Sequence, residues 1–320
     1  MRSSFLLTLF LLLAPLCLLA GVAFGSVDLP LADVLRALAG RDSGLAADIV
    51  WQLRLPRTAS AFACGGLLAL AGALLQALLR NPLADPYVLG ISGGAAVAAL
   101  TAMLFGLAAA AVGFAAFGGA LAAVGLVFVL GFSGGWNTLR LLLAGVVLSA
   151  GFGAFISLLL TLAPGAQVRG MLFWLMGDLS QAQSPGLALA LLLSILALGL
   201  WQAKSLDILG LGELKAKSLG VAVRPLQYGI YFTASAATAA VVVQAGTIGF
   251  VGLIVPHFVR LLGVNGHRWL LPLAALAGGS FLTLADTLAR TVVAPQQLPV
   301  GVLTALLGVP ILLYLLVRKA

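Results

Sequence analysis

The stretch TASAFACGGLLALAGALLQALLRNPLADPYVLGISGGAAV, residues 58–97, joins an uncharged segment to a polar one. Residues 58–79 carry no charged side chain, and Arg80, Asn81 and Pro82 follow them directly. About 20 apolar residues in a helix span the hydrocarbon core of a bilayer. Proline lacks the backbone N–H that a helix needs, and it disfavours a helical residue before it. The stretch therefore predicts a membrane-spanning helix that ends at the membrane surface.

The whole chain has the composition of a membrane protein. Of its 320 residues, 62% are hydrophobic and 8% are charged, whereas a soluble domain has about 25% charged residues. The mean hydropathy is +1.18. The uncharged runs are long enough for helices and lack the short alternating segments of membrane barrels. These runs are residues 3–27, 58–79, 86–139, 141–168, 179–203, 225–259, 269–285 and 291–317.

Two of these runs are long enough for two helices each. We divide residues 86–139 in the glycine-rich stretch Gly106–Gly113, and residues 225–259 around Gln244–Thr247. No long linker divides the chain, so we predict one membrane domain over residues 1–320, an all-α polytopic fold with about ten transmembrane helices. The predicted helices are residues 4–25, 58–79, 88–106, 112–132, 139–162, 184–203, 226–244, 248–262, 270–290 and 299–317.

The basic residues predict how the chain is oriented, because cytoplasmic loops carry an excess of Lys and Arg. If Arg2 is cytoplasmic, eleven of the 17 basic residues, including all four lysines, fall in cytoplasmic segments. Both termini are then cytoplasmic, and loop anchoring explains the net charge of +8 without a nucleic-acid partner. The eleven are Arg2, Arg80, Arg140, Lys204, Lys215, Lys217, Arg224, Arg260, Arg268, Arg318 and Lys319.

The N-terminal apolar segment has two interpretations. Arg2 followed by apolar residues that end near residues 19–21 is compatible with a signal peptide, but we favour an uncleaved first helix in a chain of many spans. Cys17 and Cys64 both lie inside predicted helices. We interpret them as small buried apolar residues, with no disulfide and no metal implied.

Charged groups inside the predicted membrane segments are the first candidates for function, and they are few. Asp286 and Arg290 are one helical turn apart and can pair with each other. We interpret His257 and His267 as polar groups at helix ends and not as metal or haem ligands. The chain has no phosphate-binding glycine-rich loop and no adjacent nucleophile and base, so we expect neither catalysis nor a bound cofactor.

The largest cytoplasmic loop, KSLDILGLGELKAKSLGVAVRP at residues 204–225, suggests a contact with another protein. Glu213 and Lys217 are spaced as an i,i+4 ion pair, which supports a short helix. Gly220 can end that helix, and Pro225 can begin the next one. The loop is either a lever for a soluble partner or a solvated connector.

Three stretches of the chain resemble the permease family of ABC importers for iron siderophores, haem and cobalamin. They are residues 54–95, which begin RLPRTASAFACGG; residues 212–221, GELKAKSLGV; and residues 246–316, which begin GTIGFVGLIVPHFVRLLGVNGHRW. The resemblance implies a type II importer permease in the bacterial inner membrane that moves a metal chelate from periplasm to cytoplasm. It implies a homodimer, a cytoplasmic ATPase dimer that carries ATP and Mg, and a periplasmic substrate-binding protein.

The resemblance also assigns residues to a cytoplasmic gate. Asn81 and Leu83 match gate-lining positions, and Asn137, Thr138 and Leu139 match a second gate region. The alternative is that the loop after residue 79 only ends one helix and starts another.

Two further sets of residues follow from the resemblance. The ATPase would meet the chain at Glu213, Ala216, Lys217 and Gly220. The binding protein would dock on arginines at the outer face, whose simpler role is to anchor the chain among lipid headgroups. These arginines are Arg54, Arg57 and Arg290.

Two questions stay open at the level of sequence. A self-contained channel or secondary transporter for a small solute is the alternative to an ATP-driven importer. Among the chelates, the shortage of polar residues favours haem or cobalamin over a charged siderophore. The aromatic segment 165–181 either anchors the chain at the membrane surface through Phe173 and Trp174 or places these side chains at the outer mouth of the pore.

Overall fold

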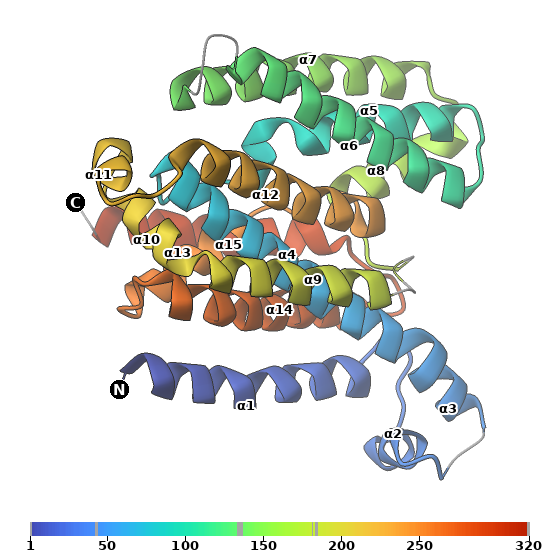
Figure 1. The fold of residues 1–320 in the computed structure, drawn as a ribbon. Coiled ribbons are helices and arrows are strands. Elements are labelled where there is room, and N and C mark those ends of the chain that lie inside the picture. Colours follow the sequence, from blue (N-terminus) through green and yellow to red (C-terminus); the bar gives the residue numbers. More distant parts are fainter. Residues whose placement is uncertain (1, 42–43, 133–136, 181, 183–184, 319–320) are drawn as a thin grey trace.

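The computed structural model describes the chain except for residues 1, 42–43, 133–136, 181, 183–184 and 319–320. The described residues form a bundle of helices (Figure 1), which confirms the predicted all-α fold. The α-helices are α1 (Arg2–Ala23), α2 (Leu31–Leu38), α3 (Leu45–Asp48), α4 (Leu55–Leu79), α5 (Ile91–Leu104), α6 (Ala109–Phe132), α7 (Thr138–Leu162), α8 (Gly165–Met176), α9 (Pro185–Trp201), α10 (Ala203–Gly210), α11 (Glu213–Ser218), α12 (Val223–Ala245), α13 (Val251–Leu261), α14 (His267–Thr291) and α15 (Val300–Arg318).

Each of the ten predicted spans overlaps one of these helices. Six described helices are long and apolar enough to cross a membrane, and α9 becomes a seventh only if α10, which is bent from it by 62°, is counted with it. The other three predicted spans coincide with the shorter apolar helices α5, α13 and α15. Both predicted divisions are confirmed, because α5 ends before Gly106 and α12 ends at Ala245.

The predicted start of the second span, residue 58, was too late. A π-helical turn at Ile49–Arg54 joins α3 to α4, so the helical segment runs without a break over Leu45–Leu79. Arg54 and Arg57 are charged and marked the membrane boundary in the sequence. In the structure both lie inside this long helix, where other parts of the chain supply their partners.

Helix α4 is the centre of the bundle. In its most apolar window 94% of the residues are buried, compared with 11% for α7. Helices α9, α12, α13 and α14 all pack against α4. Helix α1 packs mainly against α14 and lies at one side of the bundle (Figure 1). Because only 11% of the residues in the α7 window are buried, most of the surface of α7 is left for lipid or another protein.

Glycines allow the backbones around α4 to approach closely. A Cβ atom at Gly65 would collide with the carbonyl group of Gly278 in α14, and one at Gly72 would collide with Gly252 in α13. Helices in lipid associate largely through such packing, because lipid gives no hydrophobic force between them. These glycines explain how α4 can be surrounded on several sides.

We expect the change Gly278→Leu to prevent normal assembly of the bundle. Its side chain would meet the backbone of Gly65 and the Cβ of Ala69, and overpacking costs about 1–3 kcal/mol or more. Thermal stability in detergent, followed by size-exclusion chromatography, measures the effect. The control Gly118→Ala adds a methyl group where no atom lies within 4 Å. Equal stability of the two variants would contradict this account of the packing.

A buried glutamine replaces a backbone hydrogen bond that is missing in α13. Pro256 lies inside α13 and has no N–H to offer the carbonyl of Gly252, four residues earlier. The side-chain amide of Gln76 in α4 donates instead to the carbonyls of Gly252 (3.5 Å) and Leu253 (3.1 Å). A polar residue in the apolar run 58–79 thus satisfies a backbone group that would otherwise be unpaired in the membrane.

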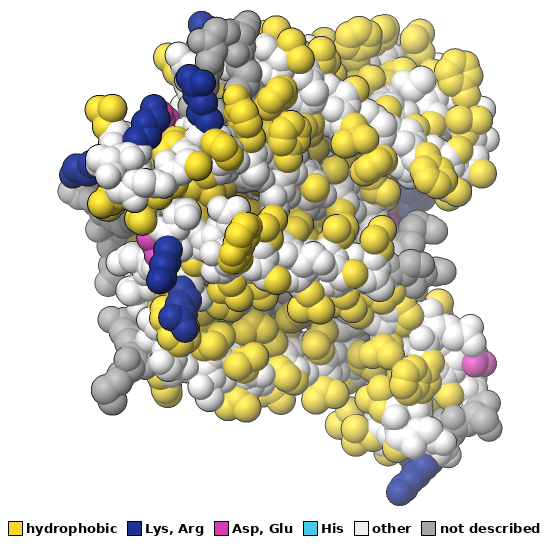
Figure 2. All heavy atoms as spheres, in the orientation of Figure 1, with side chains coloured by type: hydrophobic (Ala, Val, Ile, Leu, Met, Phe, Trp, Pro, Cys, Tyr) yellow, Lys and Arg dark blue, Asp and Glu magenta, His cyan; other side chains and the backbone are white. Residues whose placement is uncertain are grey.

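The two ends of the bundle carry different residues. Both termini, α10 and α11 lie at one end (Figure 1), where Lys204, Lys215 and Lys217 occur. Basic side chains gather there, while the middle of the visible face is apolar (Figure 2). We call this the lysine end; Lys319 lies outside the described residues. The arginine end is the opposite end, where Arg57 and Arg290 meet.

Candidate functional site

At the lysine end, the polar interruption after α4 forms a defined turn. Arg80 has a φ of 49° and ends α4 in the left-handed conformation. The side chain of Asn81 accepts a hydrogen bond from the backbone N–H of Leu83 at 2.9 Å. Leu83 is 40% exposed. The predicted helix end is confirmed, and the gate role of Asn81 and Leu83 stays a prediction.

The rest of this turn is tied to the centre of the bundle. Asp85 accepts a hydrogen bond from the N–H of Tyr87 (2.7 Å) and so caps the short helix Pro86–Leu89. The Tyr87 hydroxyl accepts one from the N–H of Ile248, between α12 and α13. Burial raises the pKa of Asp85 to about 6, although the hydrogen bond from Tyr87 acts in the opposite direction. The loop is thus held from two sides.

A groove of about 600 Å³ at the lysine end brings two predicted sites together. It is bounded by the start of α7, by α11 and by Arg80 at the end of α4. Asn137 caps α7 by accepting a hydrogen bond from the N–H of Arg140 at 3.1 Å. The second predicted gate region therefore lies beside the predicted ATPase contact. The lining residues are Arg80, Asn137, Thr138, Leu139, Leu211, Gly212, Glu213, Leu214 and Lys215.

The loop 204–225 contains two helices, α10 and α11, where one short helix was predicted. The predicted ion pair between Glu213 and Lys217 is wrong: the described residues show no such pair, and Glu213 accepts a hydrogen bond from Gln227 of α12 at 2.9 Å. Ala216 is fully buried. Leu214, in contrast, is 84% exposed, so α11 presents an apolar side chain to a partner.

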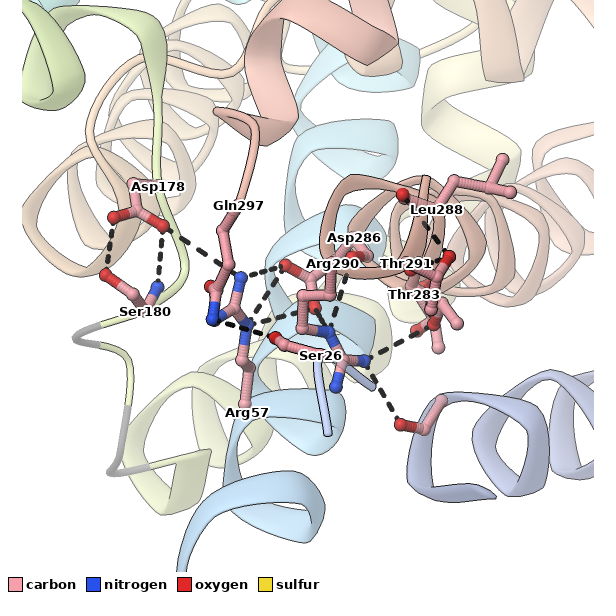
Figure 3. Close-up of polar contacts among 12 residues, drawn as sticks. Ser26, Arg57, Asp178, Ser180, Thr283, Asp286, Leu288, Arg290, Thr291 and Gln297 are labelled. Carbon is pink, nitrogen blue, oxygen red and sulfur yellow. Dashed lines mark hydrogen bonds and ion pairs between the residues drawn. The ribbon is translucent and has the colours of Figure 1, made fainter. Parts of the chain in front are cut away.

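At the arginine end, polar side chains surround Asp286 (Figure 3). Asp286 is fully buried. Arg57 Nη2 lies 2.8 Å from its Oδ1, and Arg290 Nε lies 3.0 Å from its Oδ2. Arg57 also donates to Gln297 Oε1 at 2.7 Å and lies 4.0 Å from Asp178. The predicted pairing of Asp286 with Arg290 is confirmed, and Arg57 is a second partner that was not predicted.

Two of the arginines also donate hydrogen bonds to carbonyl groups at the C-terminal end of α1. Arg54 Nη1 donates to the carbonyls of Val22 (3.0 Å) and Ala23 (2.6 Å), and Arg290 Nη2 donates to that of Gly21 (3.1 Å). The last carbonyls of a helix have no partner within it, and cations near a helix C-terminus are favourable. Arg54 and Arg290 thereby fix the end of α1 to the bundle.

This geometry separates the three predicted docking residues. Arg54 and Arg290 are 4% and 3% exposed, and both are bonded to the chain itself. The side chain of Arg57 is 11% exposed and reaches Gln297 near the surface. Docking on these arginines stays a prediction. Asp178 was not predicted to belong to this site, although it is the charged residue directly before the uncharged run 179–203 and could have been noticed for that reason.

A cavity of about 610 Å³ lies beside α8 at the arginine end. Phe173 and Trp174 line it together with Met103 and Met171, and their placement at the outer mouth of the pore stays a prediction. Its polar lining residues are Gln167, Asp178, Ser180 and Gln244. Because Asp178 also lies near Arg57, the cavity adjoins the group of polar side chains around Asp286.

The histidines and cysteines form no obvious metal centre. Among the described residues, no group of three or more His, Cys, Asp or Glu side chains could hold a metal ion. Both cysteines are free; Cys64 is buried as predicted, whereas Cys17 is partly exposed. His267 lies at a helix end, as predicted, and its Nδ1 is 2.6 Å from Asp207 Oδ1.

Comparisons with known proteins agree with this architecture. The model of the FecCD transport family matches residues 11–318. The chain is 41% identical over 314 residues to the hemin transport system permease protein HmuU of Yersinia pestis, covering 95% of this chain and 94% of that one. It is 38% identical over 284 residues to the vitamin B12 import system permease protein BtuC of Escherichia coli, covering 84% and 83%.

A solved structure gives the same result. An inward-facing conformation of a metal-chelate type ABC transporter superposes with a TM-score of 0.84 at 30% identity, covering 99% of this chain and all of that one. The chain belongs to the FecCD transport family. It is the multi-pass membrane permease of an ABC importer: it transports and does not itself catalyse a reaction. Membership implies an ATPase and a binding protein as partners and removes the alternative of a self-contained channel or secondary transporter.

Proposed function

We propose that the chain imports a haem- or cobalamin-like metal chelate. The observation that carries this proposal is 41% identity over 95% of the chain to a hemin transport permease. The next support is 38% identity to a vitamin B12 import permease. Both substrates are large metal macrocycles, and neither is as highly charged as a carboxylate-rich siderophore.

The cavity at the arginine end supports the same substrate class. Two aromatic and two thioether side chains line it, those of Phe173, Trp174, Met103 and Met171. Ligand sites for apolar molecules are lined in this way, with a few polar groups that fix orientation. Asp178 is the charged residue among those that line this cavity. A carboxylate-rich ferric siderophore would find few cationic partners here.

We place the arginine end in the periplasm and the lysine end, with both termini, in the cytoplasm. The support is the excess of basic residues in the segments assigned to the inside. In this arrangement residues 1–320 act as one permease domain, and two copies form the pore. An ATPase dimer that carries ATP and Mg meets α10 and α11, and the binding protein docks at the arginine end. The chain itself holds no cofactor.

Uptake by proteoliposomes tests the substrate. The chain is reconstituted with its ATPase and its binding protein, and labelled haem, cobalamin and a ferric siderophore are offered separately. We expect ATP-dependent accumulation of haem or cobalamin. The same vesicles without ATP give the background. Accumulation of the siderophore alone would contradict the proposal.

We expect Arg57→Gln to weaken docking of the binding protein about tenfold and to reduce the salt dependence of docking. Arg57 is the least buried of the three arginines, and a charge-assisted contact is stronger than a neutral one. Replacing Arg290 by Glu would be a poor test, because it would place two carboxylates together in the interior. Surface plasmon resonance measures the affinity.

The matched control is Arg36→Gln. Arg36 belongs to α2 at the same end, and its side chain is 64% exposed. Its loss should leave docking unchanged. Equal affinities of the Arg57 and Arg36 variants would remove Arg57 from the docking surface.

If Leu83 forms the inner gate, Leu83→Ala should leak substrate without ATP. Two copies of an apolar side chain at a symmetry axis can close a pore by excluding water. Efflux from preloaded vesicles measures the leak. Leu261→Ala is the control, because Leu261 has the same 40% exposure at the same end. In a variant that lacks Cys17 and Cys64, Leu83→Cys should form a cross-link between the two subunits. If the dimer does not leak substrate and yet forms no cross-link, the gate lies elsewhere.

A further inference from the structure

The segment that meets the ATPase is hydrogen-bonded to the start of α14. Asp207 in α10 accepts a bond from the backbone N–H of His267 at 2.9 Å, and the same oxygen lies 2.6 Å from His267 Nδ1. Residues 203–210 are all described, and within this part of the chain the side-chain hydrogen bonds that join α10 to another helix both involve the carboxylate of Asp207. A displacement of α10 therefore acts on His267.

The contact completes the N-terminus of α14. The residue before this helix, Gly266, has no side chain with which to cap it. A carboxylate at a helix N-terminus is favourable, because the first N–H groups lack partners and the helix dipole is positive there. Asp207 provides this group from a different helix. Arg260 of α13 also interacts electrostatically with Asp207, so a second positive group favours the charged carboxylate.

Helix α14 connects this contact to the other end of the protein. It has 25 residues, so it is about 37 Å long. Its far end carries Asp286 and Arg290, which bind Arg57 and the end of α1. The helix is buried along most of its length, mainly against α4 and α1. Pro272 removes one backbone hydrogen bond near the start of the helix, and the packing against α4 and α1 limits how far the helix can bend there.

We infer that Asp207 is a positioning residue that couples α10 to α14, and that α14 carries the signal between the docking and ATPase ends. This inference rests on the proposed roles of the two ends. Docking at Arg57 changes the position of α14, and Asp207 passes that change to α10. By linkage the coupling is reciprocal, so ATP binding alters docking by the same factor.

The experiment uses the complete transporter in proteoliposomes. ATP hydrolysis is measured with and without the loaded binding protein. We expect Asp207→Ala to reduce the stimulation by the binding protein about tenfold, while assembly with the ATPase and unstimulated hydrolysis stay near those of the unaltered chain. Asp207→Asn retains an acceptor oxygen and is as good a cap as aspartate, so it should keep most of the stimulation.

Two controls separate coupling from folding. Arg268→Gln changes an exposed neighbour of His267 and should have no effect. His267→Leu removes the contact between the imidazole ring and Asp207 and keeps the backbone hydrogen bond, so it should lose an intermediate part of the stimulation. If the Asp207→Ala variant does not assemble, His267→Leu takes its place in the test. Normal stimulation in the assembled Asp207→Ala variant, or in His267→Leu where the first fails, would overturn the inference.

A double-mutant cycle tests the path through α14. If Arg57 and Asp207 act along one path, Arg57→Gln with Asp207→Ala should lose no more stimulation than the stronger single variant. Losses that multiply would mean independent paths and would overturn the role of α14. A transporter that the binding protein stimulates but that takes up neither haem nor cobalamin would instead contradict the proposed function alone.

Discussion

The change Asp286→Ala is expected to destabilise the folded permease by about 3–5 kcal/mol, because it leaves the buried Arg290 and the largely buried Arg57 without their shared partner. Asp286 is fully buried and lies 2.8 Å from Arg57 and 3.0 Å from Arg290. Asp286→Asn retains an acceptor oxygen and should lose less. The midpoint of thermal unfolding in detergent, followed by fluorescence-detected chromatography, measures the loss.

An exposed ion pair provides the control for this prediction. Asp33 and Arg36 lie 3.4 Å apart on α2, with side chains 33% and 64% exposed. Surface pairs contribute about 0–1 kcal/mol, so Asp33→Ala should hardly change the midpoint. A buried pair can also be replaced by apolar residues at little cost; Asp286→Leu with Arg57→Leu and Arg290→Met should therefore recover part of the lost stability. If Asp286→Ala were as stable as Asp33→Ala, the arginine end would not depend on this carboxylate.

The sequence predicted the elements of the fold well, because apolar run length and helix-ending residues are local signals. The end of α4 at Leu79 follows from the proline at position 82 and the polar residues beside it. Glycine-rich breaks divided the long runs correctly. The pairing of Asp286 with Arg290 was also local, since one helical turn separates them.

The parts that could not be predicted depend on contacts between distant residues. Arg57 and Asp286 are 229 positions apart, and no periodicity relates them. Gln227 lies 14 positions beyond Glu213, in another helix, yet it replaces the expected partner Lys217. The charges that marked a membrane boundary at Arg54 and Arg57 were buried by other segments, which is why the start of α4 was misplaced.

The double variant Glu213→Arg with Gly220→Pro is expected to reduce ATP-dependent transport to background while the permease still inserts. Glu213 holds α11 to α12 through Gln227 at 2.9 Å, and an arginine would place a donor against that donor. Gly220 has a φ of +80°, which proline cannot adopt because its ring fixes φ near −65°. Together the changes displace α11 and its exposed Leu214. Uptake and ATP hydrolysis are measured in the same proteoliposomes.

The single variants decide how α11 acts. If its position matters, Glu213→Gln, which retains an acceptor for Gln227, should keep much of the transport, and Ser218→Ala, at the exposed end of α11, should keep all of it. If the exposed apolar contact matters, Leu214→Ala should weaken assembly with the ATPase without moving the helix. If ATP hydrolysis continues while uptake stops, the ATPase still binds the permease, but its movement no longer reaches the groove between α11 and α7. The double variant removes both the hydrogen bond from Gln227 to Glu213 and the turn at Gly220. Normal uptake by this variant would therefore show that the ATPase acts on another part of the permease.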